Sequence, residues 1–378
     1  MGDPGPAPGD GVLDRLAAEG VHAWLDSTGR AAGPYADPCR PPLAAAGMRG
    51  VRGVLCGVDT VLESLLRPER TYGNPRPRPC PGPGEPVEVL LAAQARAACD
   101  VLLRRYAAGR GADGLVAVPL APWHRGADAQ VAAARGLVRR VGRPNVLVGV
   151  RATPDGLAAV VRCLGEGLGV YCGPVFGAAA YEAVLEAWLT GLDRAHRAGL
   201  DLARIAFVSG PRLTGPPQAA ADTARLLYAC ADLRYDDPRW PALVAAGARP
   251  HRLLWTGFDP ATAAAVVPGL VGWGTGVALS GAALAAVVRD AVLRGETLGG
   301  AGPDAPRELA LARRAVAVAE ATGAAARDER RRAAVWSRAR ALAARRIRTA
   351  AGSSPAQPSG GPPYAELRPG AEPAPRPR

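Results

Sequence analysis

Short apolar segments alternate with helical segments along most of this chain, and no other feature restricts its fold as strongly. Eight buried strands are predicted, at residues 22–26, 51–56, 115–120, 145–150, 168–173, 204–209, 252–257 and 275–280. Helical patterns surround them, at residues 11–20, 59–66, 86–107, 127–141, 155–165, 178–198, 217–233 and 282–294. Because the strand segments are apolar throughout, rather than at every second residue, we expect them to be parallel and buried on both faces.

Eight strand–helix units predict an α/β fold, a closed (β/α)8 TIM barrel with extra C-terminal helices. An open Rossmann-type sheet is the alternative. Residues 307–348 predict one or two further helices, with an apolar stripe that includes Val335, Trp336 and Ala339 and with arginines on the opposite face. We therefore divide the chain into a disordered leader (1–10), a barrel with its C-terminal helices (11–348) and a disordered Pro/Gly/Arg-rich tail (349–378). Six prolines at residues 75–86 predict an irregular loop within the barrel region.

The fourth predicted strand shows how one unit is delimited. Residues 145–150 follow Arg143-Pro144 and precede Thr153-Pro154-Asp155-Gly156. Threonine is a preferred N-cap residue and proline suits the first helical position, so a helix is expected to begin at Thr153.

The basic residues of the chain are of one type, and its excess positive charge is concentrated at one end. All 46 basic residues are arginine and none is lysine, and the formal net charge is +12. From Arg307 onward there are 15 arginines and 6 acidic residues, so most of this excess lies at the C-terminal end and the preceding body is nearly neutral. A nearly neutral body argues against a nucleic-acid partner.

Cysteine usage and hydropathy suggest the compartment. The seven cysteines show no CxxC spacing and no metal-ligand spacing with histidine, as expected for reduced thiols. No apolar run reaches the length of a membrane span, and the N-terminal residues do not have the pattern of a signal peptide. We expect a cytoplasmic protein without a membrane partner, a metal or a cofactor.

The segment RPNVLVGVRATP at residues 143–154 resembles the part of transaldolases that carries their Schiff-base lysine. Similar stretches recur in order over residues 11–347, among them GVHAWLD at 20–26, YEAVLEAWLTGL at 181–192 and Trp336 in the last helix. The resemblance implies a barrel that descends from enzymes of the pentose phosphate pathway, which transfer a three-carbon ketol unit between sugar phosphates. In this chain, however, Gly149 stands at the lysine position.

The resemblance also implies where polar residues should stand at the ends of the strands. Asp26 matches an acid that takes part in proton transfer in the family. The other expected polar positions are occupied by residues of a different kind: Leu55 to Val58 on the second strand, Pro119 and Ala121 on the third, Gly149 on the fourth, Tyr171 and Gly173 on the fifth, and Gly210 and Gly215 on the sixth.

Schiff-base catalysis needs an amine nucleophile, and a guanidinium cannot serve as one. A few residues suggest other roles, each with a plain structural alternative. Asp26 could act as a base or cap a neighbouring helix, and Arg151 and Arg212 could bind a phosphate or carboxylate or be solvated loop residues. Tyr171 and Trp255 could contact a ligand or pack the barrel.

Three functional hypotheses remain open from the sequence. The first is a degenerate, non-catalytic homologue that associates with a protein or senses a sugar phosphate or other small anion; a homo-oligomer is compatible with it. The second is an enzyme of altered chemistry with Asp26 as base and with Arg151 or Arg212 as the clamp for an anion. The third is an active transaldolase that acts on sedoheptulose 7-phosphate and glyceraldehyde 3-phosphate, as the family resemblance alone implies.

Overall fold

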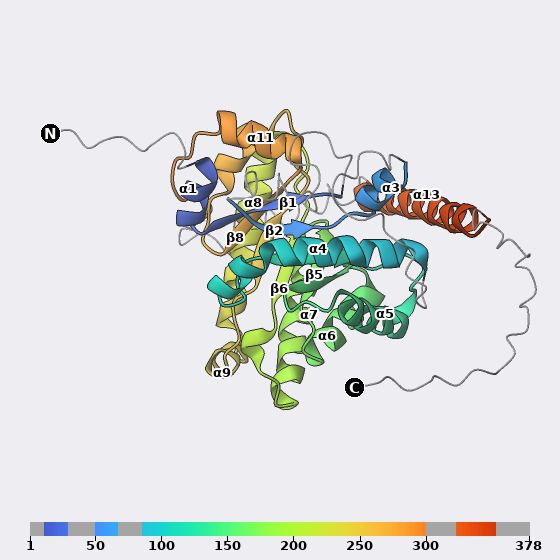
Figure 1. Cartoon of the computed structure of the whole chain (residues 1–378). Coiled ribbons are helices and arrows are strands. Elements are labelled where there is room, and N and C mark those ends of the chain that lie inside the picture. The colour runs from blue at the N-terminus through green and yellow to red at the C-terminus, as the bar shows by residue number, and fades with distance from the viewer. Residues whose placement is uncertain (1–10, 29–49, 67–84, 300–322, 353–378) are drawn as a thin grey trace, which may run out of the picture.

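A computed structural model describes residues 11–28, 50–66, 85–299 and 323–352 of the chain. The predicted leader, the tail from residue 353 and most of the proline-rich segment lie outside the described residues. The arrangement of the described elements is shown in Figure 1.

Eight parallel strands form a closed barrel in sequence order, and β1 closes it by pairing with β8. The strands are β1 (Val21–Asp26), β2 (Val51–Leu55), β3 (Leu115–Pro119), β4 (Val146–Val150), β5 (Val170–Val175), β6 (Phe207–Pro211), β7 (Arg252–Trp255) and β8 (Thr275–Leu279). The closed barrel is therefore confirmed, and the open sheet is wrong.

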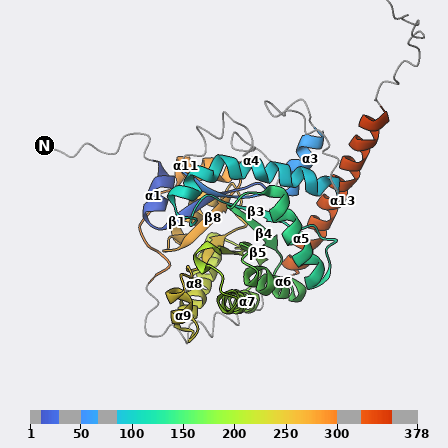
Figure 2. The same ribbon diagram turned by 60° about the horizontal axis from the view of Figure 1, so that its bottom comes forward.

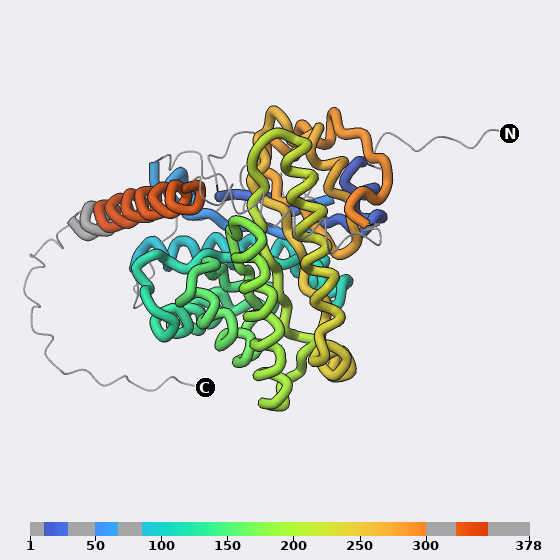
Figure 3. The backbone as a smooth tube through the Cα atoms, turned by 180° about the vertical axis from the view of Figure 1, so that it is seen from behind, coloured from blue at the N-terminus to red at the C-terminus, as the bar shows by residue number. Residues whose placement is uncertain are grey.

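Helices pack around the outside of the barrel, as Figure 3 shows from behind. They are α1 (Val12–Ala18), α3 (Val58–Leu66), α4 (Pro86–Ala108), α5 (Gly126–Val141), α6 (Pro154–Gly165), α7 (Ala178–Arg197), α8 (Pro217–Asp232), α9 (Trp240–Ala245), α10 (Ala263–Val266), α11 (Gly281–Asp290) and α13 (Ala324–Gly352). The predicted cap of α6 is confirmed, since Thr153 Oγ1 accepts a hydrogen bond from Gly156 N at 3.2 Å.

Two strands begin later than their apolar runs suggest. After α6, Leu168 N donates back to Cys163 O at 2.9 Å, so the chain is still completing the helix end and β5 begins at Val170. Before β6, Asp201 accepts from Ala203 N at 3.1 Å and holds a single 3-10 turn, Leu202–Arg204, where the sequence predicted the start of the strand. The predicted helix at 282–294 ends at Asp290, because Ala291 is extended.

The barrel strands divide their side chains between two apolar clusters. Trp24, Leu55, Leu147, Tyr171 and Leu254 belong to the smaller cluster, which fills the inside of the barrel. The larger cluster lies between the strands and the surrounding helices. Because neighbouring residues on a strand point to opposite faces, the cluster to which a residue belongs shows whether its side chain points into the barrel or toward the helices.

Helix α13 lies beside α3 and α4 at the end of the barrel where β1 and β2 finish (Figures 1 and 2). Trp336 is buried and meets the Trp123 ring edge-on, with 5.3 Å between ring centroids. The Arg340 guanidinium stacks over the same Trp123 ring at 5.0 Å and forms an ion pair with Glu85 at the start of α4. Within the described segments, no helix is long and apolar enough to cross a membrane.

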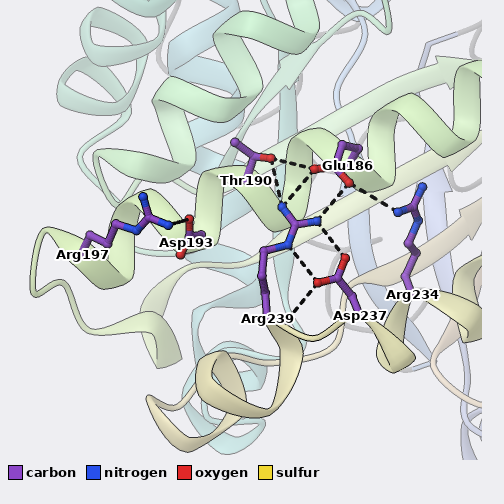
Figure 4. Close-up of polar contacts among 7 residues, drawn as sticks. All are labelled: Glu186, Thr190, Asp193, Arg197, Arg234, Asp237 and Arg239. Atoms are coloured by element: carbon purple, nitrogen blue, oxygen red, sulfur yellow. Dashed lines mark hydrogen bonds and ion pairs between the residues drawn. The ribbon is translucent and has the colours of Figure 1, made fainter.

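The flank of the barrel around α7 is held by a network of charges (Figure 4). Arg239 donates to both carboxylate oxygens of Glu186 on α7 at 3.0 Å, and to Asp237 at 2.9 and 2.8 Å. The Arg239 guanidinium lowers the pKa of Asp237 to about 2. The network fastens the segment before α9 to α7.

A buried histidine lies between α7 and the segment before α9. His251 lies between two tyrosines, with its ring nitrogens 3.0 Å from the Tyr181 hydroxyl and 3.2 Å from the Tyr235 hydroxyl. The rings of Trp188 and Phe207 pack around it. Burial lowers the pKa of His251 to about 3, so the imidazole is neutral in the folded protein.

Candidate functional site

A cavity of about 160 Å³ lies at the carboxyl ends of the strands, where barrel enzymes place their chemistry. Its walls come from three sources. The carboxyl ends of β1 to β6 and Thr256, directly after β7, supply the first, and the start of α3 supplies Val58 and Asp59. Helix α13 supplies Asp328, Arg331, Arg332, Val335 and Trp336. We call this cavity the mouth.

The strand ends contribute few polar side chains to the mouth. Gly57, Pro119, Gly149 and Gly173 all line it. A Cβ atom added at Gly149 would lie 2.9 Å from Pro119 Cα and 3.0 Å from Val118 O, both backbone atoms of β3. Because backbone atoms cannot turn aside, a longer residue at position 149 would force β3 and β4 apart.

Tyr171 occupies the space between the ends of β5 and β6. Its hydroxyl lies 2.6 Å from where a Cβ at Gly173 would stand, and closer still to the corresponding position at Gly210. The glycines at these two strand ends and the tyrosine beneath them are therefore sterically coupled. Burial raises the pKa of Tyr171, with the nearby Asp26 carboxylate adding to the effect, so its hydroxyl stays protonated.

Asp26, at the end of β1, is one of three acidic residues that line the mouth, together with Asp59 of α3 and Asp328 of α13. Its Oδ1 accepts hydrogen bonds from Thr28 N at 2.8 Å and from Thr28 Oγ1 at 2.6 Å, so it caps its own turn rather than a neighbouring helix. Burial raises the pKa of Asp26, opposed by the Thr28 hydrogen bonds and by the positive charges of Arg212 and Arg331.

Four arginines line the mouth, and two of them already have partners. Arg151 binds Asp328 at 2.6 Å and Glu329 at 3.1 Å, and both carboxylates belong to α13. Arg332 donates to the backbone oxygen of Leu120 and lies 3.4 Å from Glu329. Burial, together with the positive charge of Arg151, lowers the pKa of Arg332 to about 10.

Arg212 and Arg331 are the other two arginines of the mouth. Among the described residues, neither the Arg212 side chain nor the Arg331 side chain has a hydrogen-bond or ion-pair partner. Both lie close enough to Asp26 to lower its pKa, although neither forms an ion pair with it. The mouth thus presents two guanidinium groups that have no partner within the described part of the chain, beside the half-buried carboxyl group of Asp26.

The sequence-predicted residues fall into two groups in the structure. Asp26, Gly149, Arg151, Tyr171 and Arg212 all come together at the mouth. Trp255 does not, because it lies in the outer cluster and is fully buried between the strands and the helices.

The charged residues of α13 at the mouth were not predicted as site residues from the sequence, although Val335 and Trp336 beside them belong to the predicted apolar stripe. Asp328 and Arg332 stand eight and four residues before Trp336, which places them on the same face of the helix. Extending the apolar stripe toward the start of the helix would have pointed to them.

Comparison with known proteins gives a consistent result. Residues 83–213 match the family model described as Transaldolase/Fructose-6-phosphate aldolase. Three similar proteins are named transaldolase. The one from Acidothermus cellulolyticus is 36% identical over 249 residues, covering 60% of this chain and 67% of that protein. The one from Frankia alni is 33% identical over 317 residues, covering 76% and 83%. Transaldolase 1 of Streptomyces coelicolor is 32% identical over 334 residues, covering 80% and 86%.

Proposed function

The chain belongs to the transaldolase family, and we propose that it is a member that binds a sugar-phosphate-like anion without forming a Schiff base. In this proposal the barrel has kept its scaffold and a ligand-binding mouth. The three-carbon transfer carried out through an imine has been lost, so the protein senses its ligand rather than converting it.

One observation supports the loss of imine chemistry above the others. The chain contains no lysine, and Gly149 at the family's lysine position has no space for a side chain against β3. The one primary amine in the sequence as given is at Met1, outside the described residues. An imine requires a neutral primary amine that attacks the carbonyl carbon, and arginine stays protonated.

The charges of the mouth support the binding of an anion. Arg212 offers a planar guanidinium that can donate two parallel hydrogen bonds to a phosphate or carboxylate. Asp26 can accept hydrogen bonds from ligand hydroxyl groups, and the protonated Tyr171 hydroxyl can donate one.

Borohydride trapping tests the loss of imine chemistry. The full chain is incubated with fructose 6-phosphate and sodium borohydride, in parallel with a lysine-containing transaldolase, and both are analysed by intact-mass and peptide mass spectrometry. We expect a reduced adduct on the lysine of the control protein and none on residues 11–352 of this chain. A covalent adduct on any residue of the barrel would overturn the proposal.

The surroundings of Asp26 favour a second candidate function, proton transfer next to a carbonyl group. A carboxyl group whose pKa is raised by burial suits general-base work, and the Tyr171 hydroxyl could hydrogen-bond the carbonyl oxygen. Asp26 would take the proton from the carbon beside the carbonyl, leaving an enolate whose oxygen is held by Tyr171, and would return the proton to the same carbon.

Deuterium exchange distinguishes the two functions. In heavy water, proton transfer by Asp26 would replace the C–H hydrogens of dihydroxyacetone phosphate with deuterium, which NMR detects, and Asp26→Asn would abolish the exchange. If the exchange in the presence of the wild-type chain equals that of buffer, the proton-transfer function is excluded and the binding function is unaffected.

A further inference from the structure

We propose that Arg331 of α13 and Arg212 at the end of β6 form a two-arginine clamp for the anionic group of the ligand. In the same arrangement, α13 withholds Arg151 from the ligand by covering it with its own carboxylates. This inference rests on the proposed function and assigns the residues that carry it.

Arg212 is held in place by its backbone. Its N–H donates to Val175 O at 2.9 Å, and residue 212 bridges to Thr256 beside β7. The neighbouring Gly257 has a positive φ of 96°, and a Cβ there would lie 2.9 Å from Arg212 Cγ. A glycine at this position therefore leaves room for the arginine side chain to lie along the rim of the mouth.

Arg331 is placed by its neighbours on α13. Arg332, the next residue, is tied to the Leu120 carbonyl, and Trp336 is buried against Trp123. These two contacts fix the rotation of the helix. Arg331 is exposed, lines the mouth, and lowers the pKa values of both Asp26 and Asp59 through its positive charge.

The contrast with Arg151 identifies which cations are available. Two carboxylates neutralise Arg151, whose side chain is only 17% exposed. Arg212 and Arg331 have no such partner among the described residues. An anion between them would gain charge-assisted hydrogen bonds without first breaking an ion pair.

The size and polarity of the mouth indicate the class of ligand. Its volume of about 160 Å³ lies below the ~300–1,000 Å³ typical of sites for drug-sized ligands. The clamp takes an anionic group, while Asp26 and Tyr171 offer an acceptor and a donor for hydroxyl oxygens. We therefore assign the mouth to a small hydroxylated anion, such as a phosphorylated polyol of three or four carbons.

Calorimetric titration of the full chain with three probes tests this assignment. The probes are inorganic phosphate, glycerol 3-phosphate and glycerol. We expect glycerol 3-phosphate to bind more tightly than phosphate, and glycerol not to bind. Each substitution removes a charge-assisted hydrogen bond, so Arg331→Gln and Arg212→Gln should each weaken glycerol 3-phosphate binding about tenfold or more.

Arg330→Gln is the matched control, because Arg330 is the exposed neighbour of Arg331 on α13 and does not line the mouth. It should change affinity by less than about twofold. Thermal unfolding of each variant confirms that it is folded. If Arg331→Gln binds as well as Arg330→Gln, the clamp is wrong while the proposed function survives. If the wild-type chain binds none of the three probes, the proposed function fails as well.

Discussion

The two ends of the barrel use arginine in opposite ways. At the amino end, Asp113 lies between α4 and β3 and is almost completely buried. Its Oδ1 is hydrogen-bonded to His22 Nδ1, its Oδ2 accepts from Arg52 at 3.0 Å, and Arg252 lies 3.8 Å away. Hydrogen bonding to His22 and these positive charges together lower the pKa of Asp113 against the effect of burial.

At the mouth, by contrast, Arg212 and Arg331 face a cavity, and no described carboxylate is bound to either. Cations that converge on one buried carboxylate hold strands and loops together, whereas cations left facing a cavity are available to a ligand. The structural end of this barrel therefore differs from the binding end in whether its arginines are bound to carboxylates, and not in how many arginines it has. Removing the carboxylate at the amino end should therefore alter stability, and replacing Arg212 or Arg331 at the mouth should alter affinity.

The largest effect is expected at Asp113. Asp113→Asn removes a buried carboxylate and leaves the half-buried Arg52 and Arg252 without their anion, which should lower the free energy of unfolding by about 3–5 kcal/mol. Urea denaturation followed by circular dichroism measures it. Asp128→Asn is the control, since Asp128 is paired with Arg162 but is 92% exposed; it should cost no more than about 1 kcal/mol. An equal loss of unfolding free energy in the two variants would show that the carboxylate at the amino end has no special structural role.

The second prediction concerns the coupling of Tyr171 and Gly210 at the mouth. Gly210→Ala forces a methyl group against the Tyr171 ring and should destabilise the protein by about 1–3 kcal/mol. In a double-mutant cycle, Tyr171→Val should remove most of that cost. Gly136→Ala, in α5 with nothing within 4 Å of the added Cβ, should not destabilise at all. Additive effects of the two mouth substitutions would show that the tyrosine and the glycine are independent.

The third prediction concerns the pH dependence of stability, to which the buried His251 near the amino end of the barrel contributes. His251 directly precedes β7, and its pKa of about 3 lies below that of an unfolded histidine. The unfolded chain therefore takes up a proton as the pH falls through the unfolded pKa near 6.5, and the folded protein does not. Stability should fall by about 2 kcal/mol between pH 7.5 and pH 5. His251→Gln should have a flatter profile over this range, and an equally steep one would contradict this account.

The smallest effect is expected where α13 covers Arg151. Asp328→Asn combined with Glu329→Gln frees that guanidinium while leaving the Arg212–Arg331 clamp intact. Partly exposed ion pairs are worth up to about 1 kcal/mol, so glycerol 3-phosphate affinity should rise about two- to fivefold by calorimetry. Glu85→Gln, which breaks the Arg340 contact of α13 away from the mouth, should leave affinity unchanged. Weaker binding by the double variant would mean that the two acids position α13 rather than compete with the ligand.

Most of the fold could be predicted from sequence because each unit carries its own local signals. The apolar run before Thr153-Pro154 predicted both β4 and the start of α6, and the structure has both. The errors occurred where local hydrogen bonds override apolarity. Leu168 is apolar but bonds back to the end of α6, and Ile205 follows a 3-10 turn, so neither belongs to the strand predicted for it.

Only those residues of the site that lie at strand ends could be predicted from the sequence. Strand ends gather at one edge of a parallel barrel, so Asp26, Gly149 and Tyr171 could be placed together by their position alone. Trp255 is also at a strand end, but it points outward because its neighbour Leu254 points inward. Arg331 approaches from a helix more than a hundred residues further along the chain, and its approach depends on tertiary packing that local patterns do not encode.

The rotation of helix α13 about its own axis decides which of its side chains line the mouth. An α-helix turns by about 100° per residue, and Trp336 together with the Leu120 contact of Arg332 fixes which residues face the barrel. A single residue inserted between Arg332 and Val335 would swing Arg331 away from the cavity while Trp336 stayed seated. Length changes in this short stretch would therefore abolish the clamp as completely as replacing the arginine itself.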